Sequence, residues 1–461
     1  MRRSCGWRLE DVLKATGGIL LKKGKFPYFS GISTDSRVLE KGDLFIALKG
    51  TRYDGHEFVP LVIEKGAFGI IIERHIEILH FDGAVIKVKS TIEALGKLAK
   101  HYRMRYMRYK IPFIAITGSN GKTTTKEMTA HILGLSKKVL KNKGNYNNYI
   151  GVPFTIFSMD AQHEIGIVEM ATNRPGEVDF LANIVMPEVG VITAIHPVHL
   201  MGLRDIEGVK REKGSLLKYV SKFVFNADDD RVVSLSRGFL GERIGFGIKN
   251  GDVRATTIDK NGLSGITFKI CLPGEKFTVK CRILGGHQVY NALAAATVAW
   301  VLGTPSSLIK KGLETFTPLK GRLSVFKGKN GIRILDDSYN ANPKSVLSAL
   351  EVLRDLPGKK IVVLGDMLEL GDTSKRWHEE VGRAVASILP KYFVVFGQYK
   401  ESLIKGALEG GLSSKEVLKA CSHGHILSLL NEIAEKNDIL LIKASHALGF
   451  EGLVDALTEG R

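Results

Sequence analysis

The chain has 461 residues, a formal net charge of +18 and a hydrophobic content of 44%. This length predicts about three domains, and the composition is that of a globular protein with enough apolar residues to bury several cores. No apolar run approaches the roughly 20 residues of a membrane span, and the first residues have no apolar core behind their charges. We therefore expect neither a signal peptide nor insertion in a membrane.

The four cysteines lack the C-x-x-C spacing of zinc sites and redox motifs. They indicate neither a metal site nor a disulfide framework, and this fits a reducing cytoplasm. The positive charge has three interpretations: a nucleic-acid surface, a complement to polyanionic small substrates, or a solvated lysine-rich surface. The basic residues are spread along the chain, with one cluster over residues 100–110, and no recognition motif accompanies them. We therefore expect no nucleic-acid partner.

Residues 1–109 predict a small α/β domain, because apolar strand candidates at 44–48, 68–72 and 84–88 alternate with helical patterns. Polar residues near the strand ends of this domain have two interpretations. Taken singly they are turn residues and surface charges, whereas together such groups could hold a phosphate or a sugar. The candidates are Ser33, Asp35 and Arg37.

Residues 110–315 predict a second domain built around the stretch 113–128, in which an apolar strand leads into a glycine-containing loop and then a helical pattern. Phosphate binding needs this order, because it combines backbone N–H donors, a helix N-terminus, a mobile cation and a hydroxyl for Mg²⁺. Ile116 occupies the place of the usual first glycine, so the loop is a shortened form, G-x-x-G-K-T. The alternative is a glycine-rich turn that caps a helix. The candidate nucleotide-binding residues are Gly118, Ser119, Asn120, Gly121, Lys122, Thr123 and Thr124.

Further polar groups of this domain follow apolar strand runs. Glu169 ends the run 165–168, a good position for a carboxylate that holds Mg²⁺ beside a phosphate loop. His199 follows the run 189–193, and a single histidine is more often structural than a ligand. The amide-rich run 143–153 is either a plain loop or a binding segment that presents Asn145, Asn147 and Asn148.

The end of the second domain predicts three local structures. A helical pattern over 206–219 contains Lys213, which on physical grounds alone belongs to a solvated face. A β-hairpin is expected around Pro273–Gly274. A glycine turn then leads into an alanine-rich helix whose first turn either presents Asn291 to a base or is simply polar.

Residues 316–461 alternate helix-length patterns with apolar runs, which predicts βαβ units and a second parallel, Rossmann-like sheet. Polar loops follow two of these runs, at 336–343 and 365–371. Ligands of open parallel sheets bind outside the carboxyl ends of the strands, so these loops are expected to bind substrate. Asn342 and Pro343 alternatively form the N-cap and first residue of a helix. The apolar runs are 332–335, 361–364, 393–396 and 439–442, and the candidate substrate-binding residues are Tyr339, Asn340 and Asn342.

In this order the motifs of the chain resemble the Mur ligase family over nearly the whole length. The shortened phosphate loop is the form that this family uses. Each motif is weak alone, but their order is specific. They are Ser33–Arg37 with Asp54–His56, Thr117–Thr125, Asn145–Pro153, Glu169–Met170, His199–Leu200, Lys213–Gly214, Asn291 with its alanines, Gly321–Arg322, Asp336–Pro343 and Leu364–Gly371.

The resemblance implies an ATP-dependent ligase that joins D-alanyl-D-alanine to UDP-N-acetylmuramoyl-tripeptide through an acyl phosphate, in peptidoglycan precursor synthesis. It implies an α/β protein of three domains: a UDP-sugar-binding domain (1–109), a central P-loop-type ATP-binding domain with a mostly parallel sheet (110–315) and a Rossmann-like ligase domain (316–461). It also implies ATP and two Mg²⁺ ions as cofactors, and a cytoplasmic monomer.

The resemblance also carries roles to single residues. Lys122 matches a lysine that binds the β/γ-phosphates, and Thr123, Glu169 and His199 match metal ligands. Lys213 matches a lysine that reacts with CO₂ to form a carbamate, which requires a partly neutral amine. The catalytic candidates are therefore Lys122, Lys213 and His199; Asn291 matches an adenine contact, Arg322 and Asp337 match groups that close over the nucleotide, and Ser33, Asp35 and Arg37 match contacts to the UDP-sugar.

The chain departs from the family pattern at a few positions. Ala171, Met201 and Ser215 replace the usual glycine, glutamate and glutamate, and His446 ends a run that usually reads Lys-Gly-Ser-Arg. Four rival functions remain to be compared. The sister tripeptide synthetase shares the first-domain motifs but carries another third-domain motif, and folylpolyglutamate synthetase lacks this first domain. A nucleic-acid-dependent ATPase would need helicase motifs after Glu169, and a non-catalytic nucleotide-binding module leaves the metal-ligand candidates without a role.

Overall fold

The computed structural model describes the chain except at five short stretches. Residues 1–5, which begin the sequence, and residues 108–110, which end the basic cluster, lie outside the described residues. Within the described part of the chain, no helix combines the length and the apolar character needed to cross a membrane. The described residues are 6–50, 53–78, 80–107 and 111–458.

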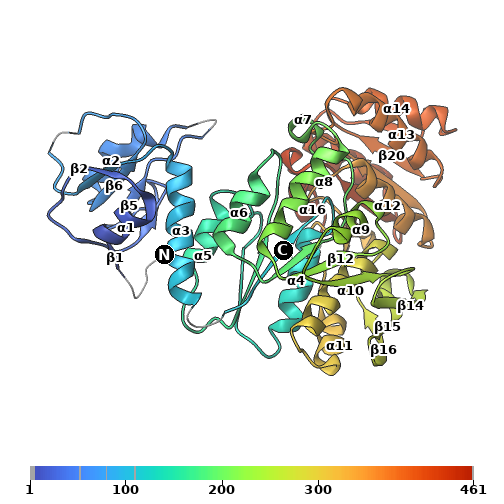
Figure 1. The fold of residues 1–461 in the computed structure, drawn as a ribbon. Helices are drawn as coiled ribbons and strands as arrows, with labels where there is room; N and C mark the ends of the chain where they lie inside the picture. Colours follow the sequence, from blue (N-terminus) through green and yellow to red (C-terminus); the bar gives the residue numbers. More distant parts are fainter. Residues whose placement is uncertain (1–5, 51–52, 79, 108–110, 459–461) are drawn as a thin grey trace. The chain divides into compact units, whose positions relative to one another are not determined.

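Contacts between residues divide the chain into two compact units, and Figure 1 colours the chain in sequence order. Each unit is built from three separate segments of the chain, because the chain passes between the units several times. The first unit consists of Met1–Ala115, Lys138–Ala171 and Gly176–Glu188, and the second of Ile116–Lys137, Thr172–Pro175 and Val189–Arg461.

A five-stranded sheet lies in the first unit, in the order β2-β7-β6-β5-β4. Its strands β4 to β7 are parallel, and β2 pairs antiparallel with β7 at one edge. Every residue of β6 is buried, as expected for a parallel strand covered on both faces. The three strands expected from the apolar runs of this region are confirmed. The elements are α1 (Leu9–Thr16), β2 (Ile19–Lys22), β4 (Ile32–Ser33), β5 (Leu44–Ile46), α2 (Val59–Glu64), β6 (Gly69–Ile72) and β7 (Ala84–Lys87).

Helix α3 (Thr91–Met107) carries a buried arginine in the same unit. Arg103 Nε donates to Val185 O at 3.1 Å and Nη2 donates to Ile111 O at 3.0 Å. Its Cζ lies 4.2 Å from the centre of the Phe113 ring. Burial lowers the pKa of this guanidinium to about 10. One member of the basic cluster is therefore a core residue that holds three chain segments together.

The strand β8 (Phe113–Thr117), expected before the glycine loop, begins in the first unit and ends in the second. In the first unit it is followed in the sheet by β10 and then β9, which pair in parallel. In the second unit the order is β8-β11-β12-β13-β14-β15-β16; β11 to β14 are parallel and β14 to β16 antiparallel. The predicted hairpin at Pro273–Gly274 is confirmed as β15–β16. The strands are β9 (Val139–Lys141), β10 (Ile165–Glu169), β11 (Val189–Ile192), β12 (Lys222–Asn226), β13 (Glu242–Gly247), β14 (Val253–Lys260), β15 (Ile266–Leu272) and β16 (Glu275–Cys281).

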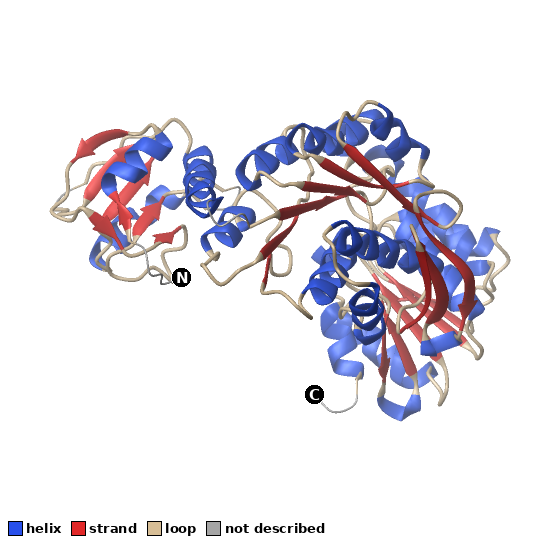
Figure 2. Cartoon of the chain, turned by 60° about the horizontal axis from the view of Figure 1, so that its bottom comes forward, coloured by secondary structure: helices blue, strands red, loops and turns tan. Residues whose placement is uncertain are grey.

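Helices flank these strands, and Figure 2 shows them around the red arrows of the sheet. The alanine-rich helix α10 packs against α4, the helix that follows the glycine loop, because small side chains allow two helices to approach closely. The helices are α4 (Lys122–Leu133), α5 (Gly151–Phe157), α6 (Glu177–Val185), α7 (Leu200–Leu203), α8 (Ile206–Gly214), α9 (Asp230–Arg237), α10 (Gly286–Val301) and α11 (Ser306–Thr315).

The last third of the chain forms a six-stranded sheet in the order β17-β18-β22-β19-β20-β21, parallel except for β17. The predicted second parallel sheet is thus confirmed. Adjacent residues of β18 enter different cores: Leu335 packs with residues of α12 to α14, and Ile334 packs with residues of α15 and α16. Burial on both faces explains why the strands are continuous apolar runs. The elements are β17 (Ser324–Lys327), β18 (Arg333–Asp336), α12 (Pro343–Asp355), β19 (Lys360–Leu364), α13 (Ser374–Ala386), β20 (Tyr392–Val395), α14 (Lys400–Glu409), β21 (Val417–Lys419), α15 (His423–Ile433), β22 (Ile439–Lys443) and α16 (Glu451–Leu457).

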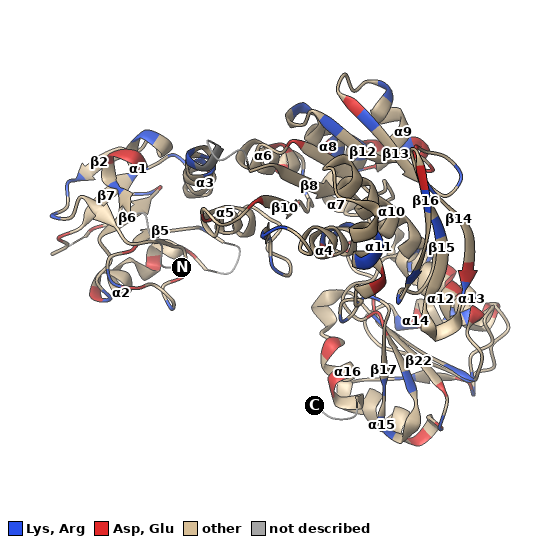
Figure 3. Cartoon of the chain, turned by 90° about the horizontal axis from the view of Figure 1, so that it is seen from below, with Lys and Arg blue, Asp and Glu red and all other residues tan. Residues whose placement is uncertain are grey.

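Lysine and arginine residues are distributed over the elements of both units, as the blue segments of Figure 3 show. This distribution agrees with the sequence, in which basic residues occur along the whole chain. A dispersed positive charge favours a solvated surface over a single nucleic-acid-binding stripe.

We expect Arg103→Met to lower the free energy of unfolding of the first unit by about 2–4 kcal/mol, because two buried carbonyls lose their charged donor. Arg376→Met is the matched control, since Arg376 forms an exposed i,i+4 pair with Glu380 on α13, and such pairs contribute under about 0.5 kcal/mol. Urea unfolding followed by circular dichroism measures both variants. Equal stability of the two variants would contradict a structural role for Arg103.

Candidate active site

Two glycines give the loop between β8 and α4 its shape. Gly118 and Gly121 have φ angles of 149° and 82°, conformations that residues with a Cβ atom rarely adopt. A Cβ atom on Gly118 would lie 1.9 Å from Thr193 Oγ1, and one on Gly121 would lie 2.2 Å from Asn291 Oδ1. Side chains from the segment after β11 and from α10 therefore lie directly against the loop, and only glycine fits at either position.

The segment after β11 holds the loop by hydrogen bonds. Thr193 Oγ1 donates to Asn120 O at 2.6 Å. Ser119 N donates to Ala194 O at 2.8 Å, Ser119 Oγ donates to His196 O at 3.0 Å, and His196 N donates back to Ser119 Oγ at 2.8 Å. The sequence interpretation did not assign Thr193 or His196 to the site. These two residues could have been assigned to the site because they follow β11, which ends at the same sheet edge as β8.

Lys122, the first residue of α4, folds back over the loop, and its Nζ donates to Gly118 O at 2.7 Å. Thr124 and Thr125 are buried in the first turn of α4. Asn291 is also buried: its Nδ2 donates to Gln288 Oε1 at 2.8 Å and its Oδ1 accepts from Thr125 Oγ1 at 3.4 Å. Asn291, the predicted adenine contact, thus lies between α10 and α4, where its amide is hydrogen-bonded to Gln288 and Thr125.

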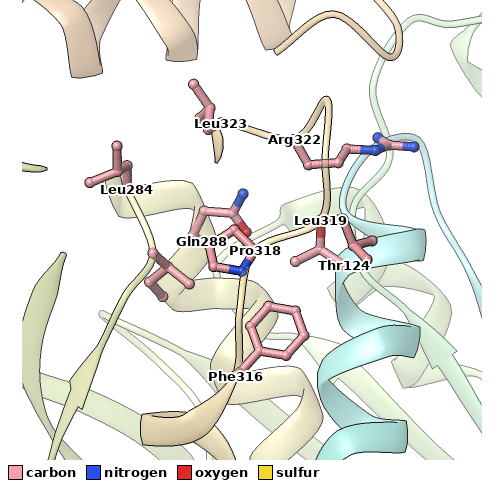
Figure 4. Close-up of a pocket in the computed structure, with 9 residues that line it drawn as sticks. Thr124, Leu284, Gln288, Phe316, Pro318, Leu319, Arg322 and Leu323 are labelled. Carbon is pink, nitrogen blue, oxygen red and sulfur yellow. The ribbon is translucent and has the colours of Figure 1, made fainter. Parts of the chain in front are cut away.

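A pocket opens beside Thr124, the third residue of α4, and Figure 4 shows its lining. Apolar side chains form most of the wall, and its polar residues are Gln288, Thr124 and Arg322. The side chain of Arg322 extends from the pocket toward the N-terminal end of α4 (Figure 4). Of the lining residues, sequence interpretation named only Thr124 and Arg322. The lining consists of Thr124, Ile283, Leu284, Gln288, Phe316, Pro318, Leu319, Arg322 and Leu323.

Residues next to the six-stranded sheet, called the third sheet below, contact the same loop. Arg322 Nη2 donates to Thr123 Oγ1 at 3.3 Å, and Asn342 Nδ2 donates to Asn120 Oδ1 at 2.8 Å. Asn342 is also the N-cap of α12, where its side chain accepts from Ser345 N, so the predicted capping role is confirmed. Two residues that the sequence separates by about 200 positions from the glycine loop therefore touch it.

Asp337 and Lys443 form a buried ion pair at the carboxyl ends of β18 and β22. Lys443 Nζ lies 2.5 Å from Asp337 Oδ2 and donates to Asn340 O at 2.7 Å, and Leu323 N donates to Asp337 Oδ1 at 3.2 Å. Burial raises the pKa of the Asp337 carboxyl and lowers that of the Lys443 ammonium, and each partner opposes the other's shift. Asp337, predicted to face the nucleotide, contacts protein donors at both oxygens.

Glu169, at the end of β10, is buried in the first unit and held by amides. Its Oε1 accepts from Asn147 Nδ2 at 2.9 Å, and its backbone N donates to Asn142 Oδ1 at 2.9 Å. Asn148 instead accepts from the N–H groups of Ile150 and Gly151 at the start of α5. Asn145 is exposed. Of the three predicted asparagines, only Asn147 reaches the carboxylate, and Asn142 was missed.

His199 contacts a carboxylate from the third sheet. Its Nδ1 lies 2.6 Å from Glu369 Oε2, and this hydrogen bond lowers the pKa of the Glu369 carboxyl. Both residues have a left-handed backbone, with φ angles of 53° and 65°. Non-glycine residues in this conformation are strained, and such residues concentrate at functional sites. Glu369 was not predicted as a site residue.

Lys213, near the end of α8, is buried with only 1% of its surface exposed, so the expectation of a solvated face is wrong. Desolvation, and then the positive charge of Lys122, hold its pKa well below the usual range, while Glu212 opposes the shift. The physical reason for the difference is that α8 turns this side of its last turn toward the core. An amine in such an environment is readily neutral and nucleophilic.

In the first unit, Ser33 ends β4, and Asp35 and Arg37 lie beside it in the turn that follows. Asp35 N donates to Ser33 Oγ at 3.3 Å, and Arg37 binds the Asp35 carboxylate with Nε at 2.9 Å and Nη2 at 2.7 Å. The hydrogen bond from Arg37 holds the pKa of the Asp35 carboxyl down at about 2. The turn therefore presents an exposed guanidinium at the carboxyl end of a parallel strand.

Comparison with known proteins places the chain among the Mur ligases along its length. Three family models match successive segments: the Mur ligase family catalytic domain over residues 28–103, the Mur ligase middle domain over 116–299, and the Mur ligase glutamate ligase domain over 321–446. UDP-N-acetylmuramoyl-tripeptide–D-alanyl-D-alanine ligase of Bacillus subtilis is 34% identical over 433 residues, 93% of each chain. The enzyme of the same name from Escherichia coli is 32% identical over 446 residues, again 93% of each chain.

Solved structures agree with these relatives. A crystal structure of MurF from Acinetobacter baumannii has a TM-score of 0.90 and 32% identity, covering 99% of both chains. The crystal structure of MurF ligase from Thermotoga maritima in complex with ADP has a TM-score of 0.80 and 29% identity, covering 92% of this chain and 96% of that chain. The predicted fold class, an α/β protein with mostly parallel sheets, is confirmed.

We expect protonation of His287 to lower the free energy of unfolding in acid. Burial, and then the charges of Lys443 and Lys344, lower its pKa to about 4, whereas the unfolded value is about 6.5. The folded state therefore resists protonation. The stability that depends on neutral His287 is full above pH 6.5 and is lost as the pH falls toward 4, by at most about 3 kcal/mol.

Substituting His287→Gln removes this titration, so the variant loses less stability than the parent between pH 6.5 and 4. Urea unfolding at several pH values measures the difference, and His75→Gln, an exposed histidine of the first unit, is the control. Parallel pH profiles of the parent and the His287→Gln variant would show that His287 is not the responsible group.

Proposed function

Because the chain belongs to the Mur ligase family, we propose that it joins D-alanyl-D-alanine to UDP-N-acetylmuramoyl-tripeptide and converts ATP to ADP and phosphate. The product would be UDP-N-acetylmuramoyl-pentapeptide, a precursor of peptidoglycan. The observation that carries this proposal is the extent of the similarity, which reaches 93% of the chain for relatives that bear this name. A match restricted to the middle segment would support ATP binding alone.

Each predicted domain has a separate task in this proposal. Residues 1–109 would hold the UDP-sugar, residues 110–315 would bind ATP, and residues 316–461 would complete the site and bind the dipeptide. Arg37 supports the first assignment, because its side chain is 85% exposed although its guanidinium is oriented by Asp35. A fixed and exposed guanidinium is suited to bind phosphate. We further propose that the enzyme is a cytoplasmic monomer.

The glycine loop would bind the phosphates of ATP, and the pocket beside it would bind the base. Lys122 and Arg322 bring two cations to the loop, since Lys122 Nζ donates to Gly118 O and Arg322 Nη2 donates to Thr123 Oγ1. The pocket offers flat apolar contacts from Phe316, Pro318 and Leu319 (Figure 4). Gln288 would make the polar contact to the base, and Asn291 would orient the Gln288 amide by donating to its Oε1. Asn291 thus supports base recognition through Gln288.

The residues Thr123, Glu169 and His199 fit Mg²⁺ ligands by their donor atoms. A buried carboxylate and a hydroxyl at a helix N-terminus are oxygen ligands of the kind that Mg²⁺ prefers. His199 Nδ1 is hydrogen-bonded to Glu369, and metal-binding histidines commonly use one ring nitrogen for such a carboxylate and the other for the metal. When bound, Mg²⁺ would neutralise charge on the phosphates of ATP.

A free carboxylate is a poor electrophile, so the terminal carboxylate of the tripeptide must first accept the γ-phosphoryl group of ATP. Lys122 would neutralise the charge on the group in transit. The amine of D-alanyl-D-alanine would then attack the acyl phosphate, and phosphate would leave as the peptide bond forms. Water competes with the amine at this step. The contacts of Arg322 and Asn342 with the glycine loop support closure of residues 316–461 over the phosphates.

Lys213 is proposed to carry a carbamate, because its buried amine is held toward the neutral, nucleophilic form. The amine nitrogen would form a bond to the carbon of CO₂ and release one proton. The product is an anion, which removes the repulsion between Lys213 and Lys122. The ammonium form of Lys213 is disfavoured by burial and by Lys122, whereas the carbamate would be stabilised by the positive charge of Lys122.

The carbamate predicts a carbamate carbon signal in the NMR spectrum of the protein in ¹³C-bicarbonate. Lys213→Arg should abolish this signal and lower kcat roughly 100-fold, because guanidinium does not react with CO₂. Lys210→Arg on the same helix is the control, since Lys210 pairs with Glu207 near the surface. An unchanged spectrum in the Lys213→Arg variant would assign the signal to another amine.

Phosphate release tests the proposed function directly. With ATP, Mg²⁺ and UDP-N-acetylmuramoyl-tripeptide, we expect release that depends on D-alanyl-D-alanine, and a product mass that matches the pentapeptide. Turnover of a shorter precursor with a free amino acid would indicate the sister tripeptide synthetase. Hydrolysis that responds to DNA or RNA, but to no muramyl substrate, would contradict the ligase function.

A further inference from the structure

The backbone around Arg322 is held in a costly conformation. Its neighbours Gly321 and Leu323 have φ angles of 74° and 54°, and a leucine in the left-handed region costs roughly 1–2 kcal/mol. Two buried carboxylates hold the turn: Gly321 N donates to Asp336 Oδ2 at 2.7 Å, and Leu323 N donates to Asp337 Oδ1 at 3.2 Å. Strain that is held this firmly commonly serves to direct a functional side chain. Here that side chain is Arg322.

A row of side-chain contacts continues from the guanidinium of Arg322 through residues that follow β18 and β22. Its Cζ lies 4.0 Å from the centre of the Tyr339 ring. The Tyr339 ring stacks on His446, with ring centres 5.1 Å apart and planes inclined by 28°. His446 Nδ1 in turn lies 2.9 Å from Glu451 Oε1 on α16. The row therefore runs from Thr123 of the glycine loop to the last helix of the chain.

We propose that Tyr339 and His446 are positioning residues of the ligase reaction. Their stacked rings hold the guanidinium of Arg322 against Thr123, next to the glycine loop. This inference rests on the proposed function, in which Arg322 faces the phosphates of ATP. A ring face attracts a cation and fixes the plane of a guanidinium without neutralising its charge. Tyr339 thus acts on the nucleotide side of the reaction, although the sequence suggested a substrate contact.

The stacking also indicates which side chain could replace His446. The guanidinium of arginine is planar and stacks on aromatic rings as imidazole does. The shared property of the two side chains is a flat surface, since their charges and hydrogen-bonding groups differ. Glu451 would hold the imidazole in the stacking orientation.

The position of Arg322 predicts which kinetic constant changes. Arg322 lines the base pocket, but its guanidinium extends away from it and reaches Thr123 at the phosphate end of the site. Loss of the stack should therefore lower kcat and the affinity for a non-hydrolysable ATP analogue. The affinity for ADP and the KM for the sugar-peptide should stay within about twofold, because neither depends on the γ-phosphate.

The test compares His446→Ala, His446→Phe and His446→Arg in the full-length protein. We expect His446→Ala to lower kcat about 3–5-fold and Tyr339→Leu about 10–30-fold, in line with the strength of stacking and cation–π contacts. His446→Phe and His446→Arg should stay within about twofold of the parent. In an Arg322→Ala background, His446→Ala should have no further effect, because the two residues act through one contact row.

His423→Ala is the matched control, since His423 packs on Phe396 and Phe450 of the same sheet region and is not part of the row. If His446→Phe loses as much activity as His446→Ala, stacking is not the basis and the proposal is wrong. A raised KM for the sugar-peptide at unchanged kcat would instead make Tyr339 a substrate contact. If the parent has no ligase activity, the proposed function fails, and the ratio of ATP-analogue to ADP affinity still decides the positioning role.

Discussion

The close approach of Thr193 and Asn291 to two glycines is the constraint on which the rest of the site depends. Each side chain occupies the space that a Cβ atom at Gly118 or Gly121 would need. The loop can therefore take its shape only if β11 and α10 are already in place beside it. This arrangement leaves Lys122 and Thr123 at the start of α4, where the positive end of a helix favours phosphate.

Two buried lysines of the second unit illustrate how surroundings decide chemistry. Lys443 is compensated by Asp337 at 2.5 Å and by Asn340 O, so it forms part of a structural ion pair. Lys213 is equally buried, but its strongest charged neighbour is the cation of Lys122. A buried cation beside another cation is unfavourable, whereas a buried cation beside a carboxylate is tolerated. The same residue type is thus suited to support a loop in one place and to react in the other.

The third sheet takes part in the site through the carboxyl ends of three adjacent strands. The strands β18, β22 and β19 end in Asp336, Lys443 and Leu364. Asp336 accepts from Gly321 N beside Arg322, Glu369 after β19 contacts His199, and Leu368 N in the same loop donates to Ser445 Oγ after β22. Crevices at such strand ends are where open parallel sheets bind ligands. The contacts of Arg322 and Asn342 with the glycine loop make the site a joint product of segments distant in sequence.

The sequence by itself determined the local structures of this protein. The strand, glycine loop and helix over 113–133, the hairpin at Pro273–Gly274 and the start of α12 at Asn342 all follow from residues that are neighbours along the chain. Apolar runs likewise predicted the parallel strands, because a strand buried on both faces must be apolar throughout. Short-range sterics, capping and hydrophobic pattern are sufficient for such features.

Only the tertiary structure decided which distant side chains meet. The contacts of Thr193 with Asn120, of Glu369 with His199 and of His446 with Tyr339 join residues that the chain separates by about 70 to 170 positions. Likewise, the helical pattern around Lys213 did not reveal that its side chain is buried. Such contacts depend on how elements pack, and packing is set by the combined shape and burial of many side chains and by no local pattern.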